Sequence, residues 1–153
     1  MKKGRTEGGT LISQIHQISQ RVWYDVLRHN GLSDLAGARG RVIFALWNED
    51  NIHIKKLVER TSLDKATLTG IIDRLERDGY VKRIPSPDDK RATLISRTGK
   101  DEIFKSKIPE VSKQQNKLFY KGFSTSEIKD FENYLIRILQ NCKEAEAEKT
   151  WSF

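Results

Sequence analysis

The segment that decides the fold runs from Leu57 to Gly99 and reads LVERTSLDKATLTGIIDRLERDGYVKRIPSPDDKRATLISRTG. Its pattern predicts two short helices, a strand, a charged tip that contains Pro85 and Pro87, and a second strand. The second helix has one apolar stripe, and its opposite face holds small and basic residues. A helix that is buried on one side and bare on the other, followed by a cationic hairpin, suits a DNA groove. The segment therefore predicts a winged helix-turn-helix. The apolar stripe consists of Leu68, Ile71, Ile72 and Leu75.

Composition and charge are compatible with this interpretation. The chain has 153 residues, 37% hydrophobic and 32% charged, which predicts a soluble protein of one domain, or of one domain with appended helices. Its net charge of +7 favours a polyanionic partner such as nucleic acid. Twelve Lys and Arg stand against seven Asp and Glu between His53 and Lys100, so most of the excess charge lies in the predicted DNA-binding segment. The single cysteine, Cys142, excludes an intramolecular disulfide and fits a reducing cytoplasm. No apolar run is long enough for a secretory signal or a membrane span.

Apolar residues at helical spacing predict further helices before the segment. A long helix is expected from about Thr10 to His29, and a second from Ala38 to Asn48. Within the segment, Asp64 is placed to cap the second helix, because its carboxylate can accept from exposed backbone N–H groups. The two strands are expected over Tyr80–Ile84 and Ala92–Ser96.

After the hairpin, capping patterns predict two more helices. Thr98 and Asp101 resemble a capping box that opens a long helix, and Pro109 should kink or interrupt that helix. Ser124 and Glu127 form a second capping box ahead of the last helix.

From Leu57 to Ile103 the chain resembles the MarR family of winged-helix transcription factors. The most specific pieces are the run RLERDGYV from Arg74 to Val81 and the triplet DKR from Asp89 to Arg91. The resemblance implies a mainly α fold with a small β-hairpin (α+β), and an obligate homodimer formed by N- and C-terminal helices. It also implies binding to palindromic DNA and, often, to a small anionic or aromatic effector. The chain is then expected to divide into a flexible basic arm (1–9), an N-terminal dimerisation helix (10–35), the winged helix-turn-helix (36–97) and C-terminal dimerisation helices (98–153).

Two features depart from the family pattern. Arg97 occupies a position where the family usually has an apolar residue, so the start of the following helix is expected to pack differently. The helix expected from Ala38 to Asn48 carries unusual basic residues, Arg39 and Arg41, near its start. No familiar effector-site pattern is present in that helix.

The face of the recognition helix opposite the apolar stripe is the predicted base-reading surface. Small residues such as Ala66 and Gly70 let the helix approach the bases, and Thr69 can bond to base edges or touch a thymine methyl group. Gly70 costs about 1 kcal/mol relative to Ala in an exposed helix interior, which favours a role in close groove packing. The alternative is an ordinary solvated face. The predicted contacts on this helix are Lys65, Ala66, Thr67, Thr69, Gly70 and Arg74.

The wing is expected to supply the remaining DNA contacts. By the resemblance, Arg91 enters the minor groove, whose negative potential attracts it, and Asp89 orients it. The alternative is a surface ion pair between Asp89 and Arg91, which would contribute little. Lys82, Arg83 and Lys90 are expected to meet phosphates.

By the resemblance, an effector site is expected on the first two helices, at Trp23, Arg41, Phe44 and Trp47, whereas aromatic residues at helical spacing belong more often to a core. The three histidines show no metal-ligand spacing, so neither a metal site nor a cofactor is predicted. Cys142 is expected to be a small buried residue of the last helix.

These features predict a sequence-specific double-stranded DNA-binding transcriptional regulator. We expect a cytoplasmic homodimer that represses from a pseudo-palindromic operator and is released by a small effector. Enzymatic activity is not expected, since the sequence has no phosphate-binding loop, nucleophile elbow, metalloprotease motif or dinucleotide fingerprint. The alternative is a winged-helix protein-interaction module without its own DNA target, which would not need a basic wing.

Overall fold

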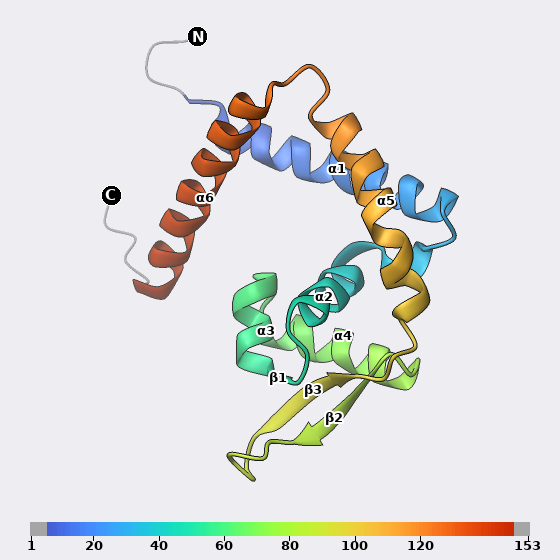
Figure 1. Cartoon of the computed structure of the whole chain (residues 1–153). Coiled ribbons are helices and arrows are strands. Elements are labelled where there is room, and N and C mark those ends of the chain that lie inside the picture. The colour runs from blue at the N-terminus through green and yellow to red at the C-terminus, as the bar shows by residue number, and fades with distance from the viewer. Residues whose placement is uncertain (1–5, 149–153) are drawn as a thin grey trace. The chain divides into compact units, whose positions relative to one another are not determined.

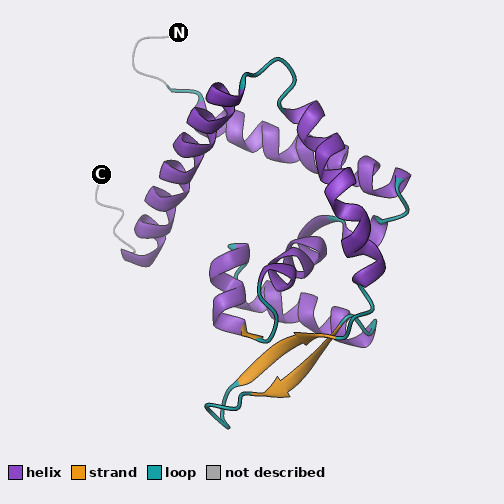
Figure 2. Cartoon of the chain, in the orientation of Figure 1, coloured by secondary structure: helices purple, strands orange, loops and turns teal. Residues whose placement is uncertain are grey.

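The structure, a computed structural model, describes residues 6–148 and is mainly helical with one small sheet (Figures 1 and 2). This confirms the predicted fold class. The first five residues of the predicted basic arm lie outside the described residues. The chain forms two compact units that divide between Gln115 and Asn116. The helices are α1 (Gly8–His29), a short 3-10 helix η1 (Ser33–Leu35), α2 (Gly37–Asn48), α3 (Ile54–Thr61), α4 (Lys65–Arg77), α5 (Glu102–Phe119) and α6 (Thr125–Glu148).

The sheet has three antiparallel strands in the order β1 (Ile52–His53), β3 (Thr93–Arg97) and β2 (Val81–Pro85). Strands β2 and β3 form the hairpin of the wing, with Val81 opposite Arg97 and Pro85 opposite Thr93. Both strands begin one residue later than the sequence pattern predicts. The short strand β1 precedes α3 and pairs with β3, which joins the wing to the rest of the first unit.

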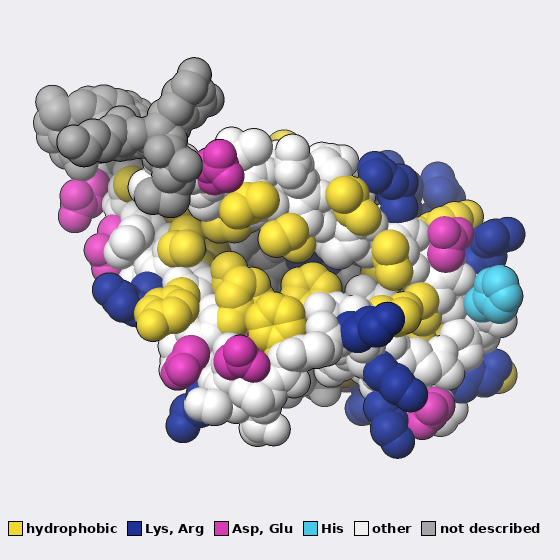
Figure 3. Space-filling model, turned by 90° about the horizontal axis from the view of Figure 1, so that it is seen from above, with side chains coloured by type: hydrophobic (Ala, Val, Ile, Leu, Met, Phe, Trp, Pro, Cys, Tyr) yellow, Lys and Arg dark blue, Asp and Glu magenta, His cyan; other side chains and the backbone are white. Residues whose placement is uncertain are grey.

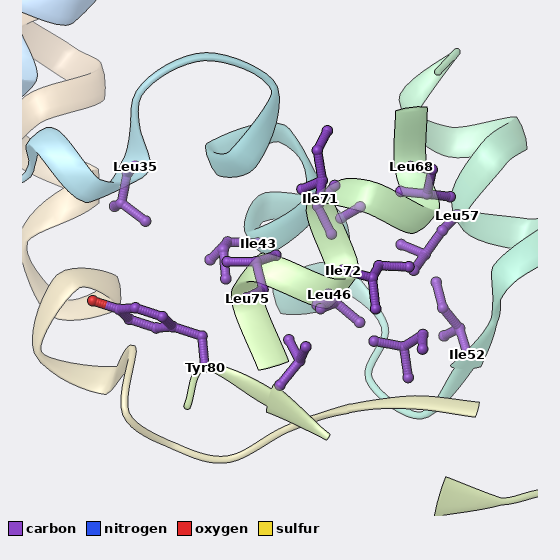
Figure 4. Close-up of a cluster of buried hydrophobic side chains, with 14 of the residues drawn as sticks. Leu35, Ile43, Leu46, Ile52, Leu57, Leu68, Ile71, Ile72, Leu75 and Tyr80 are labelled. Atoms are coloured by element: carbon purple, nitrogen blue, oxygen red, sulfur yellow. The ribbon is translucent and has the colours of Figure 1, made fainter. Parts of the chain in front are cut away.

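The apolar stripe predicted on α4 is buried. Its four residues are no more than 4% exposed and pack against Ile43 and Leu46 of α2 and Leu57 of α3. Figure 4 shows these side chains pointing toward one another among the three helices. Because these four side chains are buried in the core, only the opposite face of α4 is accessible to a ligand.

Glycine is required at position 40, where α2 approaches η1. A Cβ atom on Gly40 would lie 1.8 Å from the carbonyl oxygen of Leu35, which is well inside van der Waals contact. Helix α2 therefore packs against η1 only because this residue has no side chain.

The structure excludes an interruption of α5 at Pro109 and also excludes the capping box expected at the start of this helix. The helix continues through Pro109, which lies on the exposed side, where the carbonyl group left without a donor can bond to water. The capping box of Thr98 and Asp101 is not formed. The Thr98 hydroxyl donates instead to the Gly79 carbonyl at 2.6 Å, and the Asp101 carboxylate is buried against α2.

The second capping box is confirmed in the second unit. The backbone N–H of Ser124 donates to the Glu127 carboxylate at 2.7 Å, and the N–H of Glu127 donates to the Ser124 hydroxyl at 3.2 Å. These bonds lower the pKa of Glu127 and fix the start of α6.

Cys142 on α6 is exposed rather than buried as expected. None of the described helices is both long and apolar enough to span a membrane.

Candidate nucleic-acid interface

The start of helix α4 is fixed by Asp64. Its carboxylate accepts from the backbone N–H of Thr67 at 2.8 Å and from the Thr67 hydroxyl at 2.6 Å, and these bonds lower the pKa of Asp64. The cap confirms the position predicted for the helix start. It also commits the Thr67 hydroxyl proton, so toward an outside partner this hydroxyl can only accept.

The bare face of α4 is accessible along its length. Lys65, Ala66, Thr67 and Arg74 are exposed, and Thr69 and Gly70 are half-buried. The Thr69 hydroxyl donates to the Lys65 carbonyl at 2.8 Å, so its methyl group and oxygen lone pairs remain for an outside partner. A Cβ atom on Gly70 would meet no atom within 4 Å. Packing within this chain therefore does not explain a glycine at this position.

Arg83 on β2 is bound to two carboxylates of α4. Its Nη2 lies 2.6 Å from Asp73 Oδ1, and its Nη1 donates to Glu76. These bonds, led by the one to Asp73, raise the pKa of Arg83. Asp73 lies on the bare face of α4, and Glu76 lies beside it because the two residues are three positions apart on a helix. The neighbouring Lys82 is exposed, and no ion pair to it occurs within residues 6–148.

At the wing tip, Asp89 shapes the turn rather than pairing with the guanidinium. Its carboxylate accepts the backbone N–H of Arg91 at 2.9 Å, and its own N–H donates to the Ser86 hydroxyl at 3.4 Å. Asp89 and Arg91 form no ion pair in the described part of the chain. Both Lys90 and Arg91 are exposed and lack an acidic partner there. The tip therefore presents two cations without an ion pair, beside Asp88 and Asp89, at the end of a hairpin that projects from the first unit (Figure 1).

The predicted effector residues lie at a separate place, between α1 and α2. An open hollow of about 850 Å³ is lined by Trp23, Arg41 and Phe44 together with polar residues of α1. The rings of Trp23 and Phe44 are 6.4 Å apart, and both also pack against the core. Arg41 has no acidic partner among the described residues, and its nearest bond is a long one of 3.5 Å to the Thr61 carbonyl. Trp47 is not among the lining residues, because its indole N–H is bound to Asp101.

Comparison with known proteins identifies relatives of this fold. The model of the MarR family matches residues 38–93. The HTH-type transcriptional regulator SarZ of Staphylococcus aureus is 39% identical over 71 residues, which are 46% of this chain and 48% of SarZ. The chain therefore matches about half the length of this curated relative.

Two solved structures resemble the chain over most of its length. The transcriptional regulator SlyA has a TM-score of 0.80 at 21% identity, with 95% of this chain and 100% of SlyA covered. A MarR variant from E. coli, complexed with operator DNA, has a TM-score of 0.75 at 27% identity, with 86% of this chain and 92% of MarR covered. The winged-helix fold is thus shared well beyond the segment that the family model matches.

Proposed function

We propose that this chain is a member of the MarR family of winged-helix transcriptional regulators and that it binds double-stranded DNA in a sequence-specific manner. The observation that carries the proposal is the pairing, on the same unit, of a bare helix face with a wing tip where Lys90 and Arg91 are exposed and form no ion pair within the described residues. The face of α4 around Gly70 has room for a close partner, and the side chains of Lys90 and Arg91 are free to reach one because no carboxylate of the described chain is paired with them. A DNA duplex, with a wide major groove beside a narrow minor groove, fits both features at once.

In the proposed complex, α4 lies in the major groove and the wing lies over the adjacent minor groove. Arg91 enters the minor groove from a turn that Asp89 holds in shape. Lys82 and Lys90 contact phosphates and contribute to affinity more than to sequence choice. Arg83 can reach a phosphate only by leaving Asp73 and Glu76. The base-reading residues on α4 are Lys65, Ala66, Thr67, Thr69, Gly70 and Arg74.

We further propose that the active form is a homodimer. On α1, Leu11 and Ile18 are about half exposed, and the described part of α6 contains no buried residue, with Ile136 63% exposed. Hydrophobic side chains are also visible on the molecular surface in Figure 3. A single chain rarely leaves so much apolar area in water, and a second copy of the same helices would cover it. Two-fold symmetry then calls for a pseudo-palindromic operator with half-sites about 34–36 Å apart.

The proposed regulation is repression that a small effector relieves. The hollow between α1 and α2 offers aromatic rings from Trp23 and Phe44 and the guanidinium of Arg41, and the Asp25 carboxylate that also lines it is paired with Arg28. This combination suits an aromatic anion. Such a ligand would release DNA if it bound preferentially to a dimer whose recognition helices are wrongly spaced.

The test is selection of bound fragments from genomic DNA of the source organism, followed by fluorescence titration of the enriched duplex. We expect enrichment of a palindromic sequence and an affinity that falls steeply with added salt. A folded protein that enriches no sequence and binds duplexes equally and weakly would overturn the proposal. That result would favour the alternative, a winged-helix module that binds a protein.

A further inference from the structure

The start of α5 contains a buried carboxylate that the proposed DNA contacts do not use. Asp101 is wholly buried, and both of its oxygen atoms are bonded. Arg97 Nε lies 2.9 Å from Oδ2 and Arg97 Nη2 lies 3.1 Å from Oδ1, so the guanidinium holds the carboxylate with two parallel bonds. The indole N–H of Trp47 donates to Oδ2 as well.

These bonds join three segments of the first unit that are distant in sequence. Trp47 lies in the last turn of α2, Arg97 is the last residue of β3, and Asp101 directly precedes α5. Arg97 is itself well enclosed, with a side chain only 11% exposed, and it also bonds Glu102 of α5. Its backbone N–H donates to the Asp50 carboxylate at 2.9 Å, just beyond α2. The base of the wing and the start of α5 are thus bonded to the same end of α2.

Stability alone does not account for such an arrangement. A buried ion pair loses about as much free energy in desolvation as it gains in attraction, and apolar side chains of similar volume often hold a junction as firmly. What a bidentate guanidinium–carboxylate pair adds is direction, because its bonds are strong only in one planar geometry. The hydrogen bond from the Trp47 indole N–H restricts the orientation of the Asp101 carboxylate in addition to the two bonds from Arg97.

We propose that Trp47, Arg97 and Asp101 are positioning residues that fix the direction in which α5 leaves the winged-helix module. This inference rests on the proposed homodimer. If the second copy is held through the helices outside the module, the direction of α5 determines the distance between the two recognition helices. The three residues therefore determine which half-site spacing the dimer accepts.

The first test measures the distance between the two wings of the dimer without DNA. Cys142 is the only cysteine, so Cys142→Ser combined with Asp88→Cys places one spin label on each wing for pulsed electron resonance. We expect one narrow distance distribution in this background, and a distribution at least twice as wide when Asp101→Asn or Trp47→Phe is added. Glu49→Gln is the matched control, because Glu49 follows α2 directly but is paired with Lys56 and Arg60 of α3 rather than with Arg97. This variant should leave the width unchanged.

The second test uses duplexes whose half-sites are moved apart or together by one or two base pairs. The unlabelled wild type should prefer one spacing, whereas Asp101→Asn and Trp47→Phe should lose about tenfold at that spacing and keep half-site affinity within twofold. Unchanged width and unchanged spacing preference would overturn the positioning role. Equal losses on half-site and full-site DNA would also overturn it, in favour of a purely structural role. If the labelled background protein forms a dimer but the unlabelled wild type binds no duplex, the proposed function is overturned, while the distance measurement still decides the positioning role.

Discussion

The guanidinium of Arg83 lies 2.6 Å from the carboxylate of Asp73, so the wing strand β2 is fastened to the exposed side of helix α4. A cation that is bound to two carboxylates carries little net charge toward DNA, whereas the adjacent Lys82 has no such partner within the described residues. The two neighbouring cations should therefore contribute differently to the salt dependence of binding.

We expect Lys82→Gln to lower the slope of log affinity against log salt concentration by about 1, the value for one lost phosphate contact. Arg83→Gln should lower the slope by clearly less, because the arginine is already neutralised by Asp73 and Glu76. Fluorescence titration at several salt concentrations measures both slopes. A full unit lost from Arg83→Gln would instead place this arginine on a phosphate.

Substitutions of Gly70 on α4 should affect the stability of the protein and its affinity for DNA in opposite directions. Because nothing lies within 4 Å of a Cβ atom built there, Gly70→Ala should raise the free energy of unfolding by about 1 kcal/mol through better helix propensity. If bases approach this position closely, Gly70→Leu should weaken operator binding by tenfold or more without unfolding the protein. Urea unfolding and titration of the same two variants supply the measurements. Unchanged operator affinity in Gly70→Leu would remove Gly70 from the interface.

The wing tip gives a direct test of the minor-groove contact. Arg91→Ala should lower operator affinity by at least tenfold while leaving the dimer intact, because the lost guanidinium has no structural partner in the described chain. The matched control is Arg77→Ala at the end of α4, an exposed arginine with only a 3.5 Å contact to Asp78, and its effect should be small. Equal effects from the two variants would mean that the wing contributes only general charge.

The sequence predicts the core of α4 and the wing correctly because both depend on local periodicity. The stripe from Leu68 to Leu75 repeats at helical spacing, and Asp64 can be recognised as a cap from its immediate neighbours. The strands were predicted one residue early because Tyr80 and Ala92 fit a strand by residue type, while ladder pairing begins at Val81 and Thr93.

What the sequence did not reveal depends on contacts between distant positions. Trp47 and Asp101 are hydrogen-bonded but lie 54 residues apart, so no local pattern indicates their contact. The local pattern predicts instead a capping box of Asp101 with Thr98, whose hydroxyl donates to the Gly79 carbonyl in the structure. The departure of Arg97 from the family pattern was the only sign of this network, and it indicated a different packing without naming a partner. The need for glycine at position 40 likewise arises only from the approach of Leu35.

Tyr80 makes stability sensitive to alkaline pH. Burial, together with the 2.8 Å bond to the Asp34 carboxylate, raises the pKa of Tyr80 from 10.0 to about 12. The folded state therefore holds this proton more tightly than the unfolded state, and the resulting stabilisation is complete below pH 10 and lost as the pH rises toward 12. We expect Tyr80→Phe to cost about 1 kcal/mol at neutral pH and to weaken the alkaline loss. Urea unfolding of wild type and Tyr80→Phe between pH 8 and pH 11 measures this difference. Parallel losses of stability in the two proteins would contradict the role of Tyr80 in the alkaline loss.

Asp101 gives the opposite dependence, at acid pH. Burial by itself would raise the pKa of Asp101, but the hydrogen bonds from Arg97 and Trp47 outweigh it, and the pKa lies below its ordinary value of 3.8. The carboxylate thus contributes stability that is present above pH 3.8 and is lost as the pH falls through the lower, folded-state pKa. At neutral pH, Asp101→Asn should lower the free energy of unfolding by about 3 kcal/mol, because Arg97 is left enclosed without its charge partner. The gap between wild type and variant should narrow below pH 3.8, because Asp101 of the unfolded wild-type chain then binds a proton that the folded protein still excludes. Urea unfolding of both proteins at pH 7 and at pH 3 measures the gap, and Glu49→Gln serves as the control for a general loss of surface charge. A gap that stays the same at both values of pH would mean that the side-chain shape, rather than the ionised pair, holds the start of α5 on α2.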